Sequence, residues 1–419
     1  DSAHTLEQEA RLLMARAAQG GGALRLSLRS LLYEKYRLRE ELARKLGYER
    51  SRRAAGDYHA RKPPVHCGAT VHSVVGCTFR CAYCYLPDMG VSFERAQPYG
   101  LSGEEMALAL LENRYFLPGL RGTYIALGSI GEPLHPVGVS RTLEYVEAFA
   151  RLLHNPVQLS TKAVVSEEVA RRLAAVKGAP VSPLVTIITL RLHRALEPAA
   201  PDPWRRLEGM RRMRRAGLYP VLFLRPLIPG LEDEVADLMR LAREHGAVAV
   251  VLGGLRVTPR IIERLRGAGL DVSRILSRVR GRLRPGVQVS VPSDDLKEMA
   301  AEEARRAGLI PLYSACCANT LNIFLKRGVR IPCAGLDFVD GRFCARCPVD
   351  CRSIGVELDL DEVRWAVREY LGVDAVGVVE EDHKLVLEVR DVKRAKRRLR
   401  ERRGYRHMLE VAFRKRIVV

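Results

Sequence analysis

The ten cysteines of this 419-residue chain fall into two groups, with no cysteine between positions 84 and 316. In the first group Cys77, Cys81 and Cys84 follow one another with the spacing C-x3-C-x2-C. Three thiolates on one short loop can hold three corners of a cubic iron–sulfur cluster and leave the fourth iron open. An open coordination position is typical of a catalytic metal centre. The alternative is a zinc ion with a fourth ligand from the nearby candidates His66, Cys67 and His72.

The second group of cysteines offers a second metal site. Four thiolates with the spacing C-x10-C-x2-C-x3-C could bind another iron–sulfur cluster, namely Cys333, Cys344, Cys347 and Cys351. A structural zinc ion is the alternative, and the single C-x2-C pair argues against it. The adjacent Cys316 and Cys317 are then left as candidate catalytic residues, in the role of ligand, hydrogen donor or sulfur carrier. Two buried, inert thiols are the alternative for this pair.

Repeated alternation of apolar runs and amphipathic stretches predicts the elements that position these groups. The expected strands are residues 71–75, 124–127, 157–160, 184–190, 220–224, 247–252 and 287–291. The expected helices between them include 104–112, 142–153, 167–175, 204–216 and 235–245. Such alternation is typical of an α/β fold with a parallel sheet, either open or closing into a barrel. Functional residues in these folds lie on the loops after the strands, where the first cysteine group also falls.

The first cysteine group, with Tyr83 before the last cysteine, resembles the signature of the radical S-adenosylmethionine (radical SAM) superfamily. Residues 128–133 (GSIGEP) are similar to that superfamily's Gly-Glu-Pro motif. Residues 196–198 (LEP) and 224–230 (LRPLIPG) are most similar to its spore-photoproduct-lyase-like branch. The resemblance covers about residues 65–290 and implies a partial (β/α)6 barrel. It also implies a 4Fe–4S cluster with an open iron, S-adenosylmethionine as cofactor and an external low-potential electron donor.

The resemblance further implies how S-adenosylmethionine is bound and cleaved. Reductive cleavage gives a 5′-deoxyadenosyl radical that abstracts a substrate hydrogen. The backbone of Tyr83 is expected to meet the adenine and Lys162 the methionine carboxylate, while Thr189 is a candidate for the ribose. The methionine amino group is expected at Gly131, Glu132 and Pro133. A solvated loop lysine and an ordinary strand threonine are the alternatives for Lys162 and Thr189.

One departure from the spore photoproduct lyases limits what the resemblance implies. Those enzymes use a hydrogen-donating cysteine near the second strand, and this chain has no cysteine between positions 84 and 316. Repair of thymine lesions by that route is therefore not expected, and only the superfamily chemistry carries over.

The C-terminal residues carry much of the positive charge. The chain has a net charge of +20, and residues 390–419 hold 13 Lys and Arg against 3 Asp and Glu. Residues 391–403 read as a helix with one narrow apolar stripe, formed by Val392, Ala395 and Leu399. The remaining basic faces could bind a polyanion by releasing counterions, with Tyr405 and His407 stacking on bases. A solvated arginine-rich face is the alternative, and the stripe is too narrow to insert into a membrane.

These observations predict four regions. Residues 1–64 form a helical extension and linker, 65–292 the barrel, 293–355 a Cys-rich auxiliary cluster region, and 356–419 a small basic α+β module that binds nucleic acid. In that module 375–379, 384–389 and 407–419 are the expected strands, and Gly404 is expected to end the helix before the last strand.

The predicted function is modification of an RNA nucleoside, with tRNA as the expected substrate. Modification of a peptide or protein side chain is the rival activity, and a non-catalytic, metal-stabilised RNA-binding protein is the rival class. No run approaches the ~18–20 apolar residues of a membrane helix, and the first residues lack a signal pattern. The expected location is therefore the cytoplasm.

Overall fold

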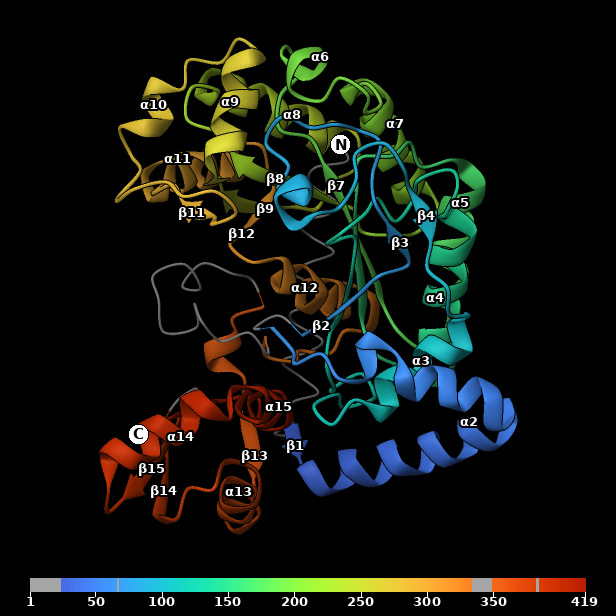
Figure 1. The fold of residues 1–419 in the computed structure, drawn as a ribbon, viewed down its shortest axis with the longest axis vertical. Coiled ribbons are helices and arrows are strands. Elements are labelled where there is room, and N and C mark those ends of the chain that lie inside the picture. The colour runs from blue at the N-terminus through green and yellow to red at the C-terminus, as the bar shows by residue number, and fades with distance from the viewer. Residues whose placement is uncertain (1–23, 66–67, 334–348, 382–383) are drawn as a thin grey trace.

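The computed structural model describes residues 24–65, 68–333, 349–381 and 384–419. Its centre is a sheet of seven strands that are all parallel to their neighbours and are ordered as in the sequence (Figure 1). The strands are β2 (Ala69–Val71), β5 (Ile125–Leu127), β6 (Val157–Thr161), β7 (Val181–Thr186), β8 (Val221–Leu227), β9 (Ala249–Gly254) and β12 (Ile310–Leu312). Within the described residues β2 and β12 are edge strands that do not pair with each other, so the barrel is open.

Helices cover the outer face of this sheet and connect its strands. They are α3 (Gly103–Glu112), α4 (Val139–Leu152), α5 (Glu167–Ala175), α7 (Pro203–Arg215), α8 (Val235–Glu244) and α11 (Asp294–Arg306). Local sequence sets their starts, since the Ser102 side chain caps α3 in a capping box with Glu105, and Asp202 caps α7. The predicted α/β partial barrel is confirmed. The sheet has seven strands, as many as the sequence listed, but the predicted strand 287–291 forms β11 outside this sheet and β12, which follows residue 292, takes its place.

Shorter elements lie on the loops of the barrel. The helical ones are η1 (Tyr58–Ala60), η2 (Leu86–Met89), α6 (His193–Leu196), η3 (Glu232–Glu234), α9 (Pro259–Gly267) and α10 (Ser273–Leu276). The strand pairs are β3 (Val74–Val75) with β4 (Gln97–Pro98) and β10 (Arg256–Val257) with β11 (Val289–Ser290).

One helix, α12 (Ala315–Arg327), packs against the strands from inside the barrel. It lies at the middle of the molecule in Figure 1. Buried amides join it to inward-facing side chains: Asn319 donates to Gln158 of β6 at 3.0 Å, and Asn322 donates to Ser182 of β7 at 3.0 Å. Residues 294–327 therefore extend the barrel and fill its interior, although the sequence placed them in the auxiliary region.

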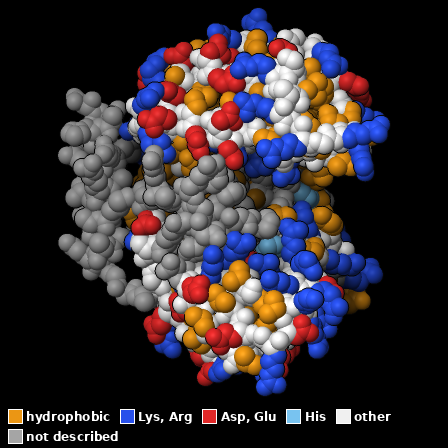
Figure 2. Space-filling view, turned by 90° about the vertical axis from the view of Figure 1, so that its left-hand side faces the viewer, with side chains coloured by type: hydrophobic (Ala, Val, Ile, Leu, Met, Phe, Trp, Pro, Cys, Tyr) orange, Lys and Arg blue, Asp and Glu red, His pale blue; other side chains and the backbone are white. Residues whose placement is uncertain are grey.

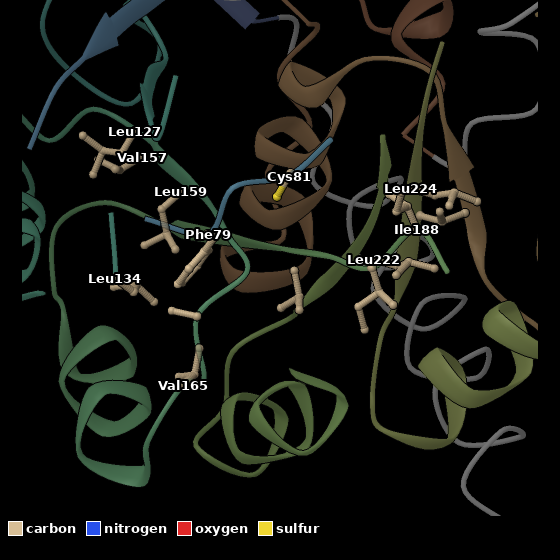
Figure 3. Packing of buried hydrophobic residues seen from close by; sticks show 14 of the residues in the cluster. Phe79, Cys81, Leu127, Leu134, Val157, Leu159, Val165, Ile188, Leu222 and Leu224 are labelled. Atoms are coloured by element: carbon tan, nitrogen blue, oxygen red, sulfur yellow. The ribbon is translucent and has the colours of Figure 1, made fainter. Parts of the chain in front are cut away.

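The main core lies between the sheet and its outer helices and reaches the loop that carries the first cysteines. Figure 3 shows Phe79 and Cys81 of that loop together with buried strand side chains such as Leu159 and Leu222. Phe79 is 7% and Cys81 5% exposed. Burial of these side chains fixes the loop to the barrel, since each buried apolar side chain contributes roughly 1.5–3 kcal/mol.

The N-terminal part packs beside the C-terminal module. Strand β1 (Leu24–Leu26) pairs in parallel with β13 (Val356–Leu358), some 330 residues away. Helix α2 (Leu28–Gly56) follows, and Gly47 interrupts it with a φ of 75° and a ψ of 174°. The helix continues to Gly56, within the region 1–64 that the sequence predicted as a helical extension and linker. No described helix has both the length and the apolar character needed to cross a membrane.

The C-terminal module contains a three-stranded sheet and four helical segments. The strands are β14 (Ala375–Glu381), β15 (Lys384–Val389) and β16 (Arg416–Val418), and the helical segments are α13 (Leu360–Ala366), η6 (Val367–Leu371), α14 (Val392–Glu401) and α15 (Arg403–Phe413). A further turn, η5 (Cys351–Ser353), precedes β13. The prediction of a strand over 407–419 is wrong for most of its length. A continuous apolar run fits a buried helix as well as a strand, and here it forms α15.

Arg414 attaches this module to the barrel. It is 1% exposed, and its guanidinium donates to the carbonyls of Pro332 at 3.2 Å, Gly122 at 2.7 Å and Arg121. The guanidinium also lies 5.0 Å from the ring centroid of Tyr124. A cation surrounded by carbonyl oxygens and an aromatic face is well compensated for its burial.

Candidate active site

A cavity of about 1210 Å³ opens at the carboxyl ends of the strands. Its wall is formed by residues that end or follow the parallel strands, among them Leu127–Glu132, Ser160–Lys162, Thr186, Arg225, Gly254–Arg256 and Leu312–Cys317. Figure 2 shows a cleft between the barrel above and the C-terminal part below, with Lys and Arg side chains along its lips. The cavity therefore lies at the ends of the strands, where the sequence analysis expects functional residues.

The three cysteines of the first group all line this cavity. They lie on one loop between β3 and η2, and none of them forms a disulfide. Gly76 precedes the first of them with a φ of 84°, and a Cβ there would come within 2.0 Å of the Arg95 carbonyl oxygen. Glycine is therefore required at the point where the chain turns into the cysteine loop.

Buried polar contacts hold the cysteine loop in place. The Tyr83 hydroxyl donates to Glu197, which forms an ion pair of 2.6 Å with Arg206, and both charged side chains are fully buried. From α9, Arg264 donates to the carbonyl of Ala82 at 3.0 Å. The sequence did not indicate this support, because Arg206 lies on the arginine-rich helix α7. On the same helix Leu207, Met210 and Met213 are buried.

Burial raises the pKa of Cys77 and of Cys81 to about 12, and it also raises the pKa of Cys84. Burial alone would lower the pKa of the Lys162 ammonium. The negative charges of Cys81, Glu197, Cys84 and Glu132 outweigh this effect, so the pKa of Lys162 is raised. The Lys162 ammonium lines the cavity 5.5 Å from the Tyr83 ring centroid. Among the described residues no acceptor is within hydrogen-bond distance of it. The three cysteine side chains are therefore neutral thiols, and a metal bound there would displace their protons.

The Gly-Glu-Pro loop lies beside the cysteine loop. Gly131 pairs with Gly76, and a Cβ on Gly131 would come within 2.4 Å of the Val74 carbonyl oxygen. The buried Glu132 carboxylate accepts hydrogen bonds from the Thr161 hydroxyl and from the Lys162 backbone N–H at 2.9 Å. Its carboxylate therefore fixes the loop to the end of β6, and the loop backbone is what faces the cavity.

The remaining predicted cofactor residues are placed as follows. Tyr83, Gly131, Glu132 and Lys162 line the cavity, whereas Pro133 and Thr189 do not. Thr189 is fully buried, and its hydroxyl donates to Glu234 at 2.8 Å and accepts from the Leu192 N–H at 3.0 Å. These bonds give Thr189 a place in the support of the loop after β7, and it does not line the cavity.

The second cysteine group lines the same cavity. Its described members there are Cys316, Cys317, Cys333 and Cys351. The sulfurs of the first three all lie within 4.8 Å of one another. The predicted ligands Cys344 and Cys347 lie outside the described residues. The structure thus joins the two cysteines predicted to be catalytic with two of those predicted to be ligands.

Apart from Lys162, the basic side chains around the cavity were not identified as site residues from the sequence. Among the described residues its lining includes six basic side chains and a single carboxylate, Glu132; the basic ones are Lys62, Arg80, Lys162, Arg225, Arg256 and Arg403. Arg403 begins α15 and comes from the C-terminal module. Arg225 lies in the LRPLIPG segment, and the resemblance of that segment was the only feature of the sequence that pointed to a role for Arg225.

The predicted base-stacking residues of the module are packed internally. His407 is 8% exposed and bonds to Glu410 at 3.1 Å. Tyr405 lies half-buried against Tyr115 and Tyr370, with ring centroids 4.9 and 5.4 Å apart. The stacking prediction is therefore wrong for His407. Of the predicted stripe on α14, Ala395 and Leu399 are buried and Val392 is 46% exposed.

The donor set fits a cubic iron–sulfur cluster with one open iron. Three thiols on one loop face the cavity, and a cationic side chain and a glycine-bounded backbone loop lie next to them. Thiolates are the ligands such clusters take, and the fourth position has no cysteine on this loop.

Comparison with known proteins gives the following findings. The family model of the radical SAM superfamily matches residues 71–242. A solved structure of spore photoproduct lyase with bound AdoMet and dinucleoside spore photoproduct is 17% identical, covering 59% of this chain and 76% of that one, with a TM-score of 0.47. Streptococcus suis SuiB bound to S-adenosylmethionine is 14% identical, covering 50% and 47% of the two chains, with a TM-score of 0.35. No curated protein matches the chain.

Proposed function

Because residues 71–242 belong to the radical SAM superfamily, we propose that this chain is an enzyme that cleaves S-adenosylmethionine and modifies an RNA nucleoside, with tRNA as the substrate class. When bound, the 4Fe–4S cluster and S-adenosylmethionine supply a low-potential electron and a sulfonium whose reductive cleavage yields a 5′-deoxyadenosyl radical. An external low-potential donor provides the electron.

The residues of the cavity have distinct parts in this proposal. Cys77, Cys81 and Cys84 would hold three irons and leave the fourth facing the cavity. The Lys162 ammonium would pair with the methionine carboxylate, which is an interaction between opposite charges in a partly dry site. The backbone at Gly131 would hold the amino group, because no side chain stands between it and the cavity.

The observation that carries the choice of substrate is the charge of the cavity wall. Six basic side chains and one buried carboxylate line it among the described residues, and Arg403 extends this wall into the C-terminal module. A polyanion is attracted to such a surface, and its phosphates can be gripped by the planar guanidinium groups. A peptide without phosphate groups would be attracted less strongly to this basic surface.

The exposed residues of α14 enlarge this surface. Lys393, Arg394, Lys396, Arg397 and Arg400 are exposed on this helix. Since only Arg402 separates the end of α14 from Arg403, an RNA strand that contacts α14 can reach the cavity mouth. The module would therefore position RNA, and the barrel would supply the chemistry.

The test uses the full chain reconstituted with iron and sulfide under anaerobic conditions. Fluorescence anisotropy would measure tRNA binding against salt concentration for the wild type, Arg256→Ala, Arg403→Ala and the control Arg171→Ala, an exposed arginine of α5 outside the cavity lining. Each cavity variant should weaken binding and reduce the salt slope by about 1, whereas the control should not.

Activity distinguishes the rival functions. Release of 5′-deoxyadenosine should rise when tRNA is added, and mass spectrometry of the digested tRNA should reveal a modified nucleoside. Release that tRNA does not alter would favour a peptide substrate. No release at all, with RNA binding intact, would favour a binding protein without radical chemistry.

A further inference from the structure

The second cysteine group has sulfur spacings that identify the kind of metal it would hold. The sulfurs of Cys316 and Cys333 lie 3.5 Å apart, and those of Cys316, Cys317 and Cys333 are all within 4.8 Å of one another. A disulfide requires about 2.05 Å, so the pair at 3.5 Å is not bonded. Sulfurs bound at about 2.3 Å to one tetrahedral ion lie about 3.8 Å apart, which is close to the spacing found here.

The first cysteine group provides an internal contrast. Among the described residues, only the Cys316 group brings three potential ligands all within 4.8 Å of one another. Cys77, Cys81 and Cys84 are all described, so at least one pair of their sulfurs lies farther apart. In a cubic cluster each thiolate binds its own iron, which separates the sulfurs more widely than a single ion does. The wider sulfur spacing of the first group therefore fits a cluster, and the closer spacing of the Cys316 group fits a single ion.

The fold places these sulfurs together by reversing the chain after α12. Cys316 and Cys317 lie in the first turn of this 13-residue helix, where the helix dipole stabilises thiolates. The helix ends at Gly328 in the left-handed conformation, and the chain then returns to Cys333. Arg414 holds the Pro332 carbonyl at 3.2 Å, which fixes the backbone next to Cys333.

Cys351 is the candidate for the fourth position, since its sulfur lies next to Cys333. Its sulfur accepts a hydrogen bond from the backbone N–H of Cys333 at 3.4 Å, which is a contact that stabilises metal-bound thiolates. It packs in the same cluster as Cys316 and Cys333. Three sulfurs therefore converge at one point of the cavity wall, and the Cys351 sulfur, which is not within 4.8 Å of all three, has to move toward them to complete the site.

We propose that Cys316, Cys317, Cys333 and Cys351 bind one zinc ion in a tetrahedral thiolate site, in place of the second iron–sulfur cluster that the sequence suggested. The site is independent of the proposed reaction. It links α12 inside the barrel to the segment that enters the C-terminal module. Because four protein ligands complete the coordination of the ion, the site is structural and does not activate a substrate.

The test is the metal content of the full chain. After expression with zinc and iron and anaerobic reconstitution, mass spectrometry of the elements should give one zinc and about four irons per chain. Cys316→Ser and Cys333→Ser should lose the zinc and keep the iron, whereas the matched control Cys77→Ser should lose iron and keep the zinc. Since none of these readings uses activity, the result does not depend on the proposed reaction.

A second measurement keeps the proposal open to refutation if a serine variant does not fold. Wild-type chain produced with Co²⁺ should display the intense visible bands of a tetrahedral cobalt–thiolate site. A weak spectrum of six-coordinate cobalt would overturn the proposal. About eight irons per chain without zinc, or zinc retained in both serine variants, would also overturn it.

Discussion

Replacing Glu197 by glutamine tests how much the buried support of the cysteine loop contributes. The change keeps the size of the side chain and an oxygen that can accept from the Tyr83 hydroxyl. It removes the negative charge that faces Arg206 at 2.6 Å, where both side chains are fully buried. The Arg206 guanidinium keeps its bonds to the carbonyls of Pro201 at 2.7 Å and Thr186 at 3.0 Å, but its charge has no counterion.

A buried charge left without its partner costs about 3 to 5 kcal/mol. For a chain of this size that corresponds to a decrease in Tm of roughly 3 to 6 °C. Differential scanning calorimetry of the reconstituted full chain would measure it, with Glu168→Gln on the surface of α5 as a control that should leave Tm nearly unchanged.

The double variant Glu197→Leu with Arg206→Met separates the charge effect from a packing effect. Removing both charges avoids the uncompensated guanidinium, so the double variant should recover most of the lost stability. The reasoning is refuted if Glu197→Gln unfolds within about 1 kcal/mol of the wild type, or if the double variant is less stable than the single one.

Three further variants test other features of the structure. Lys162→Gln should weaken S-adenosylmethionine binding by roughly 10- to 100-fold in equilibrium dialysis, since a hydrogen bond to a charged group contributes about 1.5 to 3 kcal/mol, and unchanged binding would contradict the assigned role. Burial lowers the pKa of His72 to about 3, so below pH 6.5 the unfolded chain binds a proton that the folded chain does not. Stability should therefore fall by about 2 kcal/mol between pH 7 and pH 5, and His72→Gln should flatten that slope in urea titrations. Arg414→Met should lower the free energy of unfolding by about 3 kcal/mol, because three carbonyls lose their donor, and an unaltered urea midpoint would argue against this anchor.

The barrel and its first cysteine loop could be predicted because their signals are local. Each apolar run followed by an amphipathic stretch reports a strand and a helix on its own, and the C-x3-C-x2-C spacing needs no knowledge of the rest of the chain. Even so, β12 was not anticipated. It is three residues long and contains Pro311, which lacks the N–H of a ladder donor and is tolerated here at the edge of the sheet.

Other features depend on contacts between distant segments and leave no local signal. Arg206 lies among exposed arginines on α7, and only its position opposite Glu197 makes it a buried residue. Cys316 and Cys333 meet because the chain reverses after α12, which spacing along the sequence does not reveal. Thr189 lies at the end of an expected strand, but its hydroxyl donates a hydrogen bond to the neighbouring Glu234 and does not line the cavity.

The pairing of β1 with β13, together with the anchoring of Arg414, has a practical consequence. Strand β1 belongs to the start of the described chain and β13 to its last quarter, so the smallest cooperative unit includes both. Removing the C-terminal residues would leave β1 without its hydrogen-bonded neighbour and expose Leu28 and Leu32, which are buried in the same cluster as α15. Studies of this region should therefore change individual surface charges within the intact polypeptide, since a truncated form would confuse lost binding with partial unfolding.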